Sequence, residues 1–285
     1  MRLDHVAIAL VFTGLVLQPA FAEREGSFDR TLTVSGAVDL NVETGSGRIE
    51  VRTGDGSSVR IHGVIRAHDD FFGSEGEGIH EIEKNPPISQ TGNYIKISQP
   101  LDERLRRHIS ISYELVVPRE TKLRAHTGSG SENVEGIKGP AELETGSGSV
   151  TVARVDDAVH IQTGSGRIHL EGVNGKLDAH TGSGSIEGTG IRGPINAHTG
   201  SGSVRLEQTL AGPLEAHTGS GSVNVRLPAN AAFDLYAHTG SGHVTVDHPI
   251  TVEGNIGRGH EVRGTVNGGG PLVDVRTGSG GVRIE

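Results

Sequence analysis

The stretch His180-Thr-Gly-Ser-Gly184 decides the fold, because its last four residues recur along the chain at a nearly constant interval. The tetrapeptide Thr-Gly-Ser-Gly begins at Thr44, Thr127, Thr145, Thr163, Thr181, Thr199, Thr218, Thr239 and Thr277. From Thr127 to Thr199 each step is 18 residues; the later steps are 19, 21 and 38, the last equal to two coils of 19. A sustained period indicates a repeat architecture, because a flexible glycine-rich linker keeps no period.

Each period contains two short strands separated by turns. After the turn at Thr199, Val204 and Leu206 alternate with polar residues, and Leu214 and Ala216 do so after a break at 210–213. This alternation is typical of half-buried β-strands. One such coil cannot bury its apolar side, so coils must stack at about 4.8 Å, and parallel crossovers are nearly always right-handed. The sequence predicts an all-β fold: a right-handed parallel β-solenoid with two short strands per coil of about 18 residues.

The tetrapeptides themselves are predicted to be structural turns. Examples are Thr127, Gly128, Ser129 and Gly130, and Thr181, Gly182, Ser183 and Gly184. Glycine allows a sharp reversal of the chain at such corners. Stacking places the threonines in one column and the serines in another, where hydroxyl groups can hydrogen-bond from coil to coil.

We expect three parts along the chain. Residues 1–22 form a signal peptide, because Arg2 precedes an apolar run and Ala20 and Ala22 make a small-residue cleavage site. Residues 23–120 form a less regular N-terminal β region, in which the acidic, glycine-rich stretch 71–93 is predicted to be a surface loop with a helical turn near Ile79–Lys84. Residues 121–285 form the solenoid. No later segment reaches the roughly 20 apolar residues of a transmembrane helix.

Composition excludes several classes of function. The formal net charge of −9 argues against a nucleic-acid partner, which requires a basic surface. Aromatic residues make up only 3% of the chain, which leaves few stacking platforms for sugars or bases. The absence of cysteine excludes disulfides and thiolate metal sites. We expect an exported protein that acts outside the cytoplasm, without a cofactor.

Two stretches resemble a known family. Tyr113–Pro118 followed by Lys122–Gly130 resembles the strand-proline-strand core of the bacterial DUF4097 repeat family, and Gly264–Gly270 with Val275–Gly280 is similar to its closing coil. The resemblance covers nearly the whole chain after the signal peptide. It implies a β-solenoid of the bacterial cell envelope, in the periplasm or at the cell surface, related to the head-domain DUF2807 family of candidate adhesins. The partner expected from it is an unknown protein or glycan of the envelope. It brings no catalytic residue.

A column of histidines is the candidate ligand site. The residue before the tetrapeptide is histidine at His180, His198, His217 and His238, which we expect to occupy successive coils and to point outward. Imidazoles at strand spacing can share a transition metal or form a pH-sensitive stripe. The alternative is a solvated ladder copied with the repeat. The sequence favours this alternative because no carboxylate is evident that would orient the rings.

Other chemistry finds less support. Calcium is excluded because the position two residues beyond the last glycine is apolar, as at Val150 and Ile168. The pair His180 and Ser183 recurs in other repeats, which is typical of architecture and not of one catalytic triad. The sequence therefore predicts a non-enzymatic envelope scaffold or candidate adhesin. The alternatives are a glycan- or transition-metal-binding module using the histidine column, and a carbohydrate-active β-helix enzyme.

The last predicted coil ends almost at Glu285. An unpaired terminal strand exposes free backbone groups that pair readily with another chain. The sequence therefore predicts either end-to-end self-association or capping of this strand by a partner.

Overall fold

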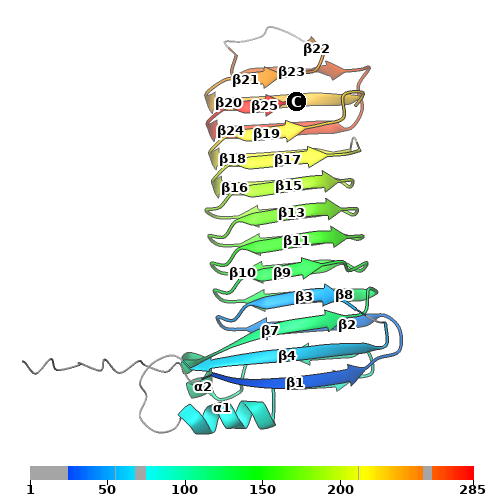
Figure 1. Cartoon of the computed structure of the whole chain (residues 1–285). Helices are drawn as coiled ribbons and strands as arrows, with labels where there is room; N and C mark the ends of the chain where they lie inside the picture. The colour runs from blue at the N-terminus through cyan, green and yellow to red at the C-terminus, as the bar shows by residue number, and fades with distance from the viewer. Residues whose placement is uncertain (1–24, 55, 68–74, 211, 253–258) are drawn as a thin grey trace, which may run out of the picture.

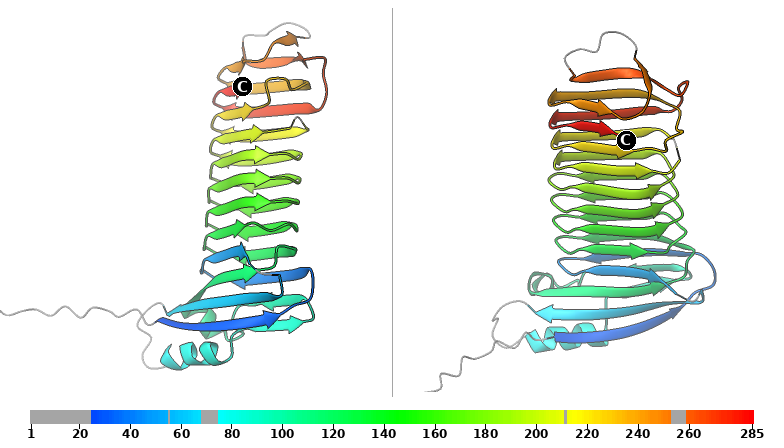
Figure 2. Two further views of the ribbon diagram at one scale, coloured as in Figure 1. Left: turned by 45° about the vertical axis from the view of Figure 1, so that its right-hand side comes forward. Right: turned by 45° about the horizontal axis from the view of Figure 1, so that its top comes forward.

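The computed structural model describes residues 25–54, 56–67, 75–210, 212–252 and 259–285, so the predicted signal peptide, residues 1–22, lies outside the described residues. The chain forms a rod of stacked coils with one sheet on each broad side (Figures 1 and 2). In Figure 1, between residues 132 and 208, the front strands run to the right, the back strands run to the left, and the chain climbs from bottom to top. This winding is right-handed, so the predicted parallel β-solenoid is confirmed.

Two sheets make up the rod, and we call them sheet A and sheet B. Sheet A has 12 strands in the spatial order β1 (Glu25–Thr33), β4 (Ser58–Ala67), β7 (Ile109–Val117), β3 (Ile49–Thr53), β9 (Glu132–Glu135), β11 (Val150–Val155), β13 (Ile168–Val173), β15 (Ile186–Ile191), β17 (Val204–Gln208), β19 (Val223–Arg226), β25 (Val282–Ile284) and β21 (Val244–Val246). Sheet B has 13 strands in the order β22 (Ile250–Val252), β23 (Glu261–Val266), β20 (Phe233–Ser241), β24 (Leu272–Ser279), β18 (Leu214–Ser220), β16 (Ile195–Ser201), β14 (Leu177–Thr181), β12 (Val159–Thr163), β10 (Ala141–Thr145), β8 (Thr121–Thr127), β2 (Val38–Thr44), β6 (Tyr94–Ile97) and β5 (Ile88–Thr91).

The core lies between the two sheets and is filled by the inward half of each strand. On β12, for example, Val159 and Ile161 are buried and His160 between them faces outward. The register pairs these residues with Leu177 and Ala179 of the next coil, so aliphatic side chains form continuous internal columns. Stacking of this kind supplies the hydrophobic contact that a single coil lacks.

The threonine of each turn is buried and joins one coil to the one before it. The Thr145 hydroxyl donates to the Gly130 carbonyl oxygen at 2.9 Å and accepts from the Gly148 N–H at 3.0 Å. Thr163 repeats both bonds with Gly148 and Gly166. The prediction of coil-to-coil hydroxyl bonding is thus confirmed for the threonine column, with a backbone carbonyl as acceptor. The serines of the turns, such as Ser165, are exposed.

Glycine is required at the last position of the turn because neighbouring coils approach closely there. A Cβ on Gly148 would collide with the carbonyl oxygen of Gly130 in the preceding coil. The turn therefore depends on the small size of glycine as well as on its backbone freedom.

The N-terminal β region belongs to the same rod. Strand β2 pairs in parallel with β8, and β3 with β9, whereas β1, β4 and β7 form an antiparallel end of sheet A. The helical turn expected near Ile79–Lys84 is the C-terminal part of α1 (Glu75–Lys84). The prediction of a surface loop over 71–93 is wrong for the rest of this helix and for β5, and residues 71–74 lie outside the described residues. Helix α1 buries Ile79 and Ile82 beside β1 and β4, and these two apolar residues were a weak signal within a polar stretch. A second helix, α2 (Glu103–His108), precedes β7.

The C-terminal coil lies inside the stack and not at its tip. Strand β24 lies between β18 and β20, and β25 lies between β19 and β21. The prediction that the step of 38 residues adds two further coils is therefore wrong. From β19 the chain continues to β20 and β21, forms β22 and β23 at the end of sheet B, and then returns into the stack as β24 and β25. Because β24 and β25 have partners on both sides, the premise for self-association through an unpaired last coil is also wrong.

Exchanging Thr163 for valine should destabilise the protein by about 2 kcal/mol, because it leaves the buried Gly148 carbonyl and the Gly166 N–H without partners at nearly constant side-chain shape. Urea unfolding of purified protein measures this change. The matched control is Ser165→Ala in the same turn, for which we expect a change below about 0.5 kcal/mol because Ser165 is exposed. Equal stability of Thr163→Val and the parent chain would contradict a structural role for the hydroxyl.

The inserted coil can be tested with cysteine pairs, since the chain has no native cysteine. Ser220 and Ser279 are register partners on neighbouring strands, so Ser220→Cys with Ser279→Cys should form a disulfide on mild oxidation. Ser220→Cys with Ser241→Cys should not, because Ser241 lies one strand further away, at about 9.6 Å. Mobility on non-reducing gels reads out the result, and the opposite pattern would restore the sequential order of coils.

Candidate functional site

The outer face of sheet B carries two columns of polar side chains. Within sheet B, each strand from β2 to β20 in spatial order contains the buried threonine of its turn. The residues one and three positions before that threonine therefore point outward. We call these the pre-threonine column and the adjacent column. From β2 to β20 in spatial order, the pre-threonine column contains Glu43, His126, Glu144, Gln162, His180, His198, His217, Arg276 and His238. The adjacent column contains Asn41, Arg124, Glu142, His160, Asp178, Asn196, Glu215, Asp274 and Tyr236.

Three of the four predicted histidines are neighbours. His180 pairs in register with His198, and His198 with His217. The prediction that His238 continues this run is wrong, because the inserted strand β24 places Arg276 between His217 and His238. The histidine column is therefore a run of three rings, followed by a guanidinium group.

The three rings lie close together and are partly shielded from water. The ring centroids of His180 and His198 are 5.2 Å apart in a stacked arrangement, and those of His198 and His217 are 4.8 Å apart and edge-to-face. Burial, and then the charges of His217 and His180, lower the pKa of His198. This environment favours the neutral imidazole, the form that binds metals.

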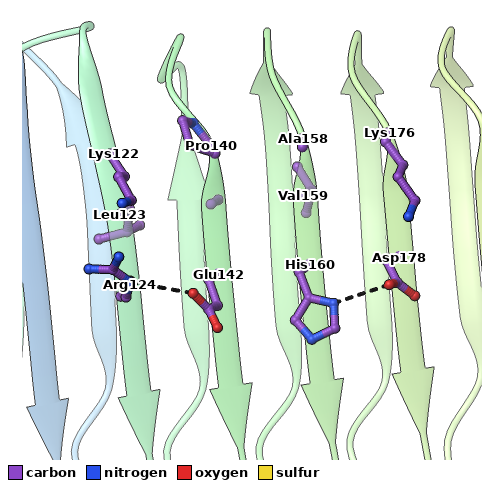
Figure 3. A pocket seen from close by; sticks show the side chains of 11 residues that line it. Lys122, Leu123, Arg124, Pro140, Glu142, Ala158, Val159, His160, Lys176 and Asp178 are labelled. Carbon is purple, nitrogen blue, oxygen red and sulfur yellow. Dashed lines mark ion pairs between the residues drawn. The ribbon is translucent and has the colours of Figure 1, made fainter.

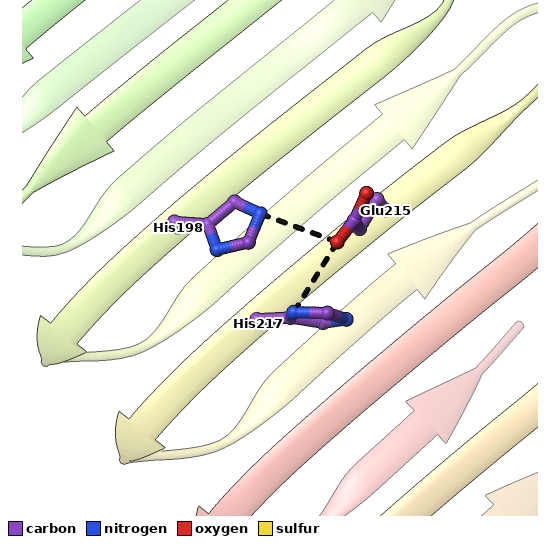
Figure 4. Close-up of side chains that lie close together, drawn as sticks. All are labelled: His198, Glu215 and His217. Carbon is purple, nitrogen blue, oxygen red and sulfur yellow. Dashed lines mark ion pairs between the residues drawn. The ribbon is translucent and has the colours of Figure 1, made fainter.

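Carboxylates of the adjacent column contact every ring of this run. Asp178 Oδ1 lies 2.6 Å from His180 Nε2. Glu215 Oε1 lies 3.5 Å from both His198 Nε2 and His217 Nδ1, as Figure 4 shows. The expectation that no carboxylate orients the rings is therefore wrong. The spacing of two residues in Asp178–His180 and Glu215–His217 was the available signal, since such residues share one face of a strand.

One group of three side chains could hold a metal ion. Donor atoms of His198, Glu215 and His217 lie within 4.8 Å of one another. Two neutral imidazoles and a carboxylate are ligands that zinc and other late transition metals accept.

A shallow pocket of about 340 Å³ lies on the same face, nearer the N-terminal end of the rod (Figure 3). Its rim contains two ion pairs: Arg124 Nε lies 3.4 Å from Glu142 Oε2, and His160 Nδ1 lies 3.4 Å from Asp178 Oδ2. Lys176 also lines the pocket. Charges of both signs alternate here, so this part of the face suits a polar partner with mixed charge more than a polyanion.

The predicted turn residues occupy structural positions. Thr127 and Thr181 are buried and donate to carbonyl oxygens of Gly47 and Gly166, while Gly128, Ser129, Gly182 and Ser183 are exposed at the corner, and Gly130 and Gly184 lie closer to the neighbouring coil. His180 is engaged by Asp178 through Nε2, and Ser183 is exposed. This arrangement offers no activated nucleophile among the described turn residues.

An isolated ionisable group, Glu132, lies inside the rod. It occupies the inward position that Ile49 and Val150 fill on the strands beside it, and its side chain is only 1% exposed. Both carboxyl oxygens lack a hydrogen-bond partner in the described structure. Burial, and to a lesser degree the charge of Glu144, raise the pKa of Glu132 to about 9. The group is therefore neutral at pH 7 and sealed from any substrate.

Comparison with known proteins gives a family match. The family model described as Toastrack DUF4097 matches residues 31–285. No curated protein matches the chain. Within the residues that the structure describes, none of the helices has the length and apolar character needed to cross a membrane.

Three solved structures superpose on the rod only loosely. A candidate adhesin from Bacteroides fragilis is 10% identical, with 91% of this chain and 97% of that chain covered at a TM-score of 0.48. One from Parabacteroides distasonis has the same identity and coverage at a TM-score of 0.41. A candidate cell adhesion protein from Clostridium sporogenes is 15% identical, with 92% and 99% covered at a TM-score of 0.29. Superpositions this loose determine neither the fold nor the function of the chain.

Replacing Glu132 with valine should stabilise the protein increasingly as the pH rises. The pKa of the carboxyl group is raised to about 9 in the folded chain from its ordinary value of 4.5. Between these two pH values the folded state binds a proton that the unfolded state has lost, so the stability of the parent chain falls as the pH rises. At pH 7 the gain in unfolding free energy should be about 3 kcal/mol. Denaturant unfolding at about pH 5, 7 and 8.5, values that lie between the two pKa values, measures this gain.

The exposed Glu171→Val on β13 is the matched control, for which we expect no gain that grows with pH. A Glu132→Val gain that is constant across the pH series would show that the native carboxyl group is not held neutral.

Proposed function

The chain belongs to the Toastrack DUF4097 family, and from this premise and the geometry of sheet B we propose that it is a non-enzymatic, exported scaffold that binds an envelope partner. The observation that carries the proposal is the outer face of sheet B. Strands in strict register present two continuous columns of polar side chains there, from β2 to β20. A rigid repeat face of this kind suits recognition of an extended surface.

The chemistry of this face supports binding and not turnover. Its imidazoles contact carboxylates, as in His180 with Asp178, and its cations contact acids, as in Arg124 with Glu142. An enzyme requires one converging group of nucleophile, base and orienting acid. The repeated pairs on sheet B are spread along the rod instead, which weakens the alternative of a carbohydrate-active enzyme.

Export is part of the proposal. Its support is the pattern of Met1–Ala22, which has the charge, apolar run and small-residue site of a signal peptide. The site of action is then the periplasm or the cell surface. The relation to the head-domain DUF2807 family remains a prediction.

Binding of the labelled full-length protein to bacterial envelope fractions tests the proposal. We expect saturable binding that falls roughly tenfold when Arg124→Ala and Lys176→Ala are combined on the outer face of sheet B, because interface cations contribute about 1.4 kcal/mol or more. The matched control combines Arg167→Ala, directly before β13, and Arg205→Ala on β17, two exposed arginines on the side of sheet A, and should bind like the parent chain. Equal loss in both variants, no saturable binding, or turnover of a polysaccharide in a broad panel would contradict the proposal.

A further inference from the structure

We propose that His198, Glu215 and His217 form a binding site for one divalent transition-metal ion of the zinc class on the outer face of sheet B. Figure 4 shows the two imidazole rings on neighbouring strands with the carboxylate between them. The site is independent of the partner-binding role proposed above, because it rests on three side chains and not on the whole face.

The two distances from Glu215 to the histidine nitrogens are close to those of tetrahedral coordination. With metal–ligand bonds of about 2.0–2.1 Å, two donors of a tetrahedral zinc ion lie about 3.3–3.4 Å apart. Glu215 Oε1 is 3.5 Å from His198 Nε2 and 3.5 Å from His217 Nδ1. All three donors lie within 4.8 Å of one another, so a small rotation of the rings completes the group. A water molecule would take the fourth position, as in other sites with three protein ligands.

The backbone holds the three side chains in place before any ion binds. His198 on β16 and His217 on β18 are register partners in a parallel ladder. Glu215 lies two residues before His217 on the same strand and on the same face. Ligands on adjacent paired strands are more precisely placed than ligands on loops, which favours binding.

Neighbouring groups complete the site. Asp274 Oδ1 lies 3.5 Å from His217 Nε2, the ring nitrogen opposite to Glu215, and Arg276 holds Asp274 by a 2.7 Å hydrogen bond. A carboxylate on the far nitrogen fixes the tautomer of a metal-binding imidazole. Asn196, the register partner of Glu215, has a buried Oδ1 without a hydrogen-bond partner. This acceptor suits a hydrogen bond from a metal-bound water.

The same face contains a similar but incomplete group. Asp178 also contacts two imidazoles, but His180 lies on its Oδ1 and His160 on its Oδ2. Glu215 instead presents one oxygen to both of its rings. Among the described residues, only the His198, Glu215 and His217 group brings three donors within 4.8 Å. The group around Asp178 therefore provides a matched control.

Titration of the full-length, untagged, metal-free protein with Zn²⁺ by calorimetry tests the site. We expect one ion per chain, with binding weakened roughly a hundredfold or more in His198→Ala, His217→Ala and Glu215→Gln, and roughly tenfold to a hundredfold in Asp274→Asn. His160→Ala should bind Zn²⁺ like the parent chain. Zn²⁺ should also raise the Tm of the parent chain and leave that of His198→Ala unchanged.

Circular dichroism shows whether each variant keeps its β-structure, and Glu215→Gln preserves side-chain size if an alanine variant does not fold. Absence of stoichiometric binding by the parent chain would overturn the proposal. So would equal binding by a folded Glu215→Gln variant, or an equal loss in His160→Ala, which would indicate general binding to histidines of the face.

Discussion

The hydrogen bond from the turn threonine to a backbone carbonyl of the neighbouring coil, a glycine carbonyl for every turn except that of Thr44, is the contact on which the rod depends. The Thr145 hydroxyl donates across to Gly130 and accepts from Gly148 of its own turn, so one buried group both closes a corner and joins two coils. The close approach leaves no space for a Cβ on Gly148. Threonine and glycine are therefore required together, which explains why the tetrapeptide recurs as a unit.

This contact keeps the coils in register, and register turns a sequence repeat into columns of side chains. Aliphatic columns fill the interior, and the pre-threonine and adjacent columns cover the outside of sheet B. Residues far apart in the chain become neighbours at strand spacing, as His198 and His217 do. The departures from the repeat are then informative: Glu132 places an acid where the neighbouring strands bury aliphatic residues, and Arg276 interrupts the histidines.

Much of the fold could be predicted from local patterns. Alternating residues such as Val204 and Leu206 indicated strands, and the spacing of the threonines indicated stacked coils. The full length of helix α1 was missed, although a helical turn was expected near its C-terminal end, because only Ile79 and Ile82 of its polar stretch pack inward. The insertion of β24 was missed because its tetrapeptide looks like every other one, and a repeated strand pairs equally well with any neighbour of matching pattern.

The sequence by itself determined the class of fold, the corner chemistry and the outward direction of the histidines, because these depend on residues within one repeat. Only the tertiary structure decided which side chains meet. The order of coils separated His217 from His238, and cross-strand pairing brought Glu215 to His198. Contacts between coils depend on the spatial order of strands. The bond from threonine to a glycine carbonyl is the same in most turns, so it leaves that order open until the whole rod is folded.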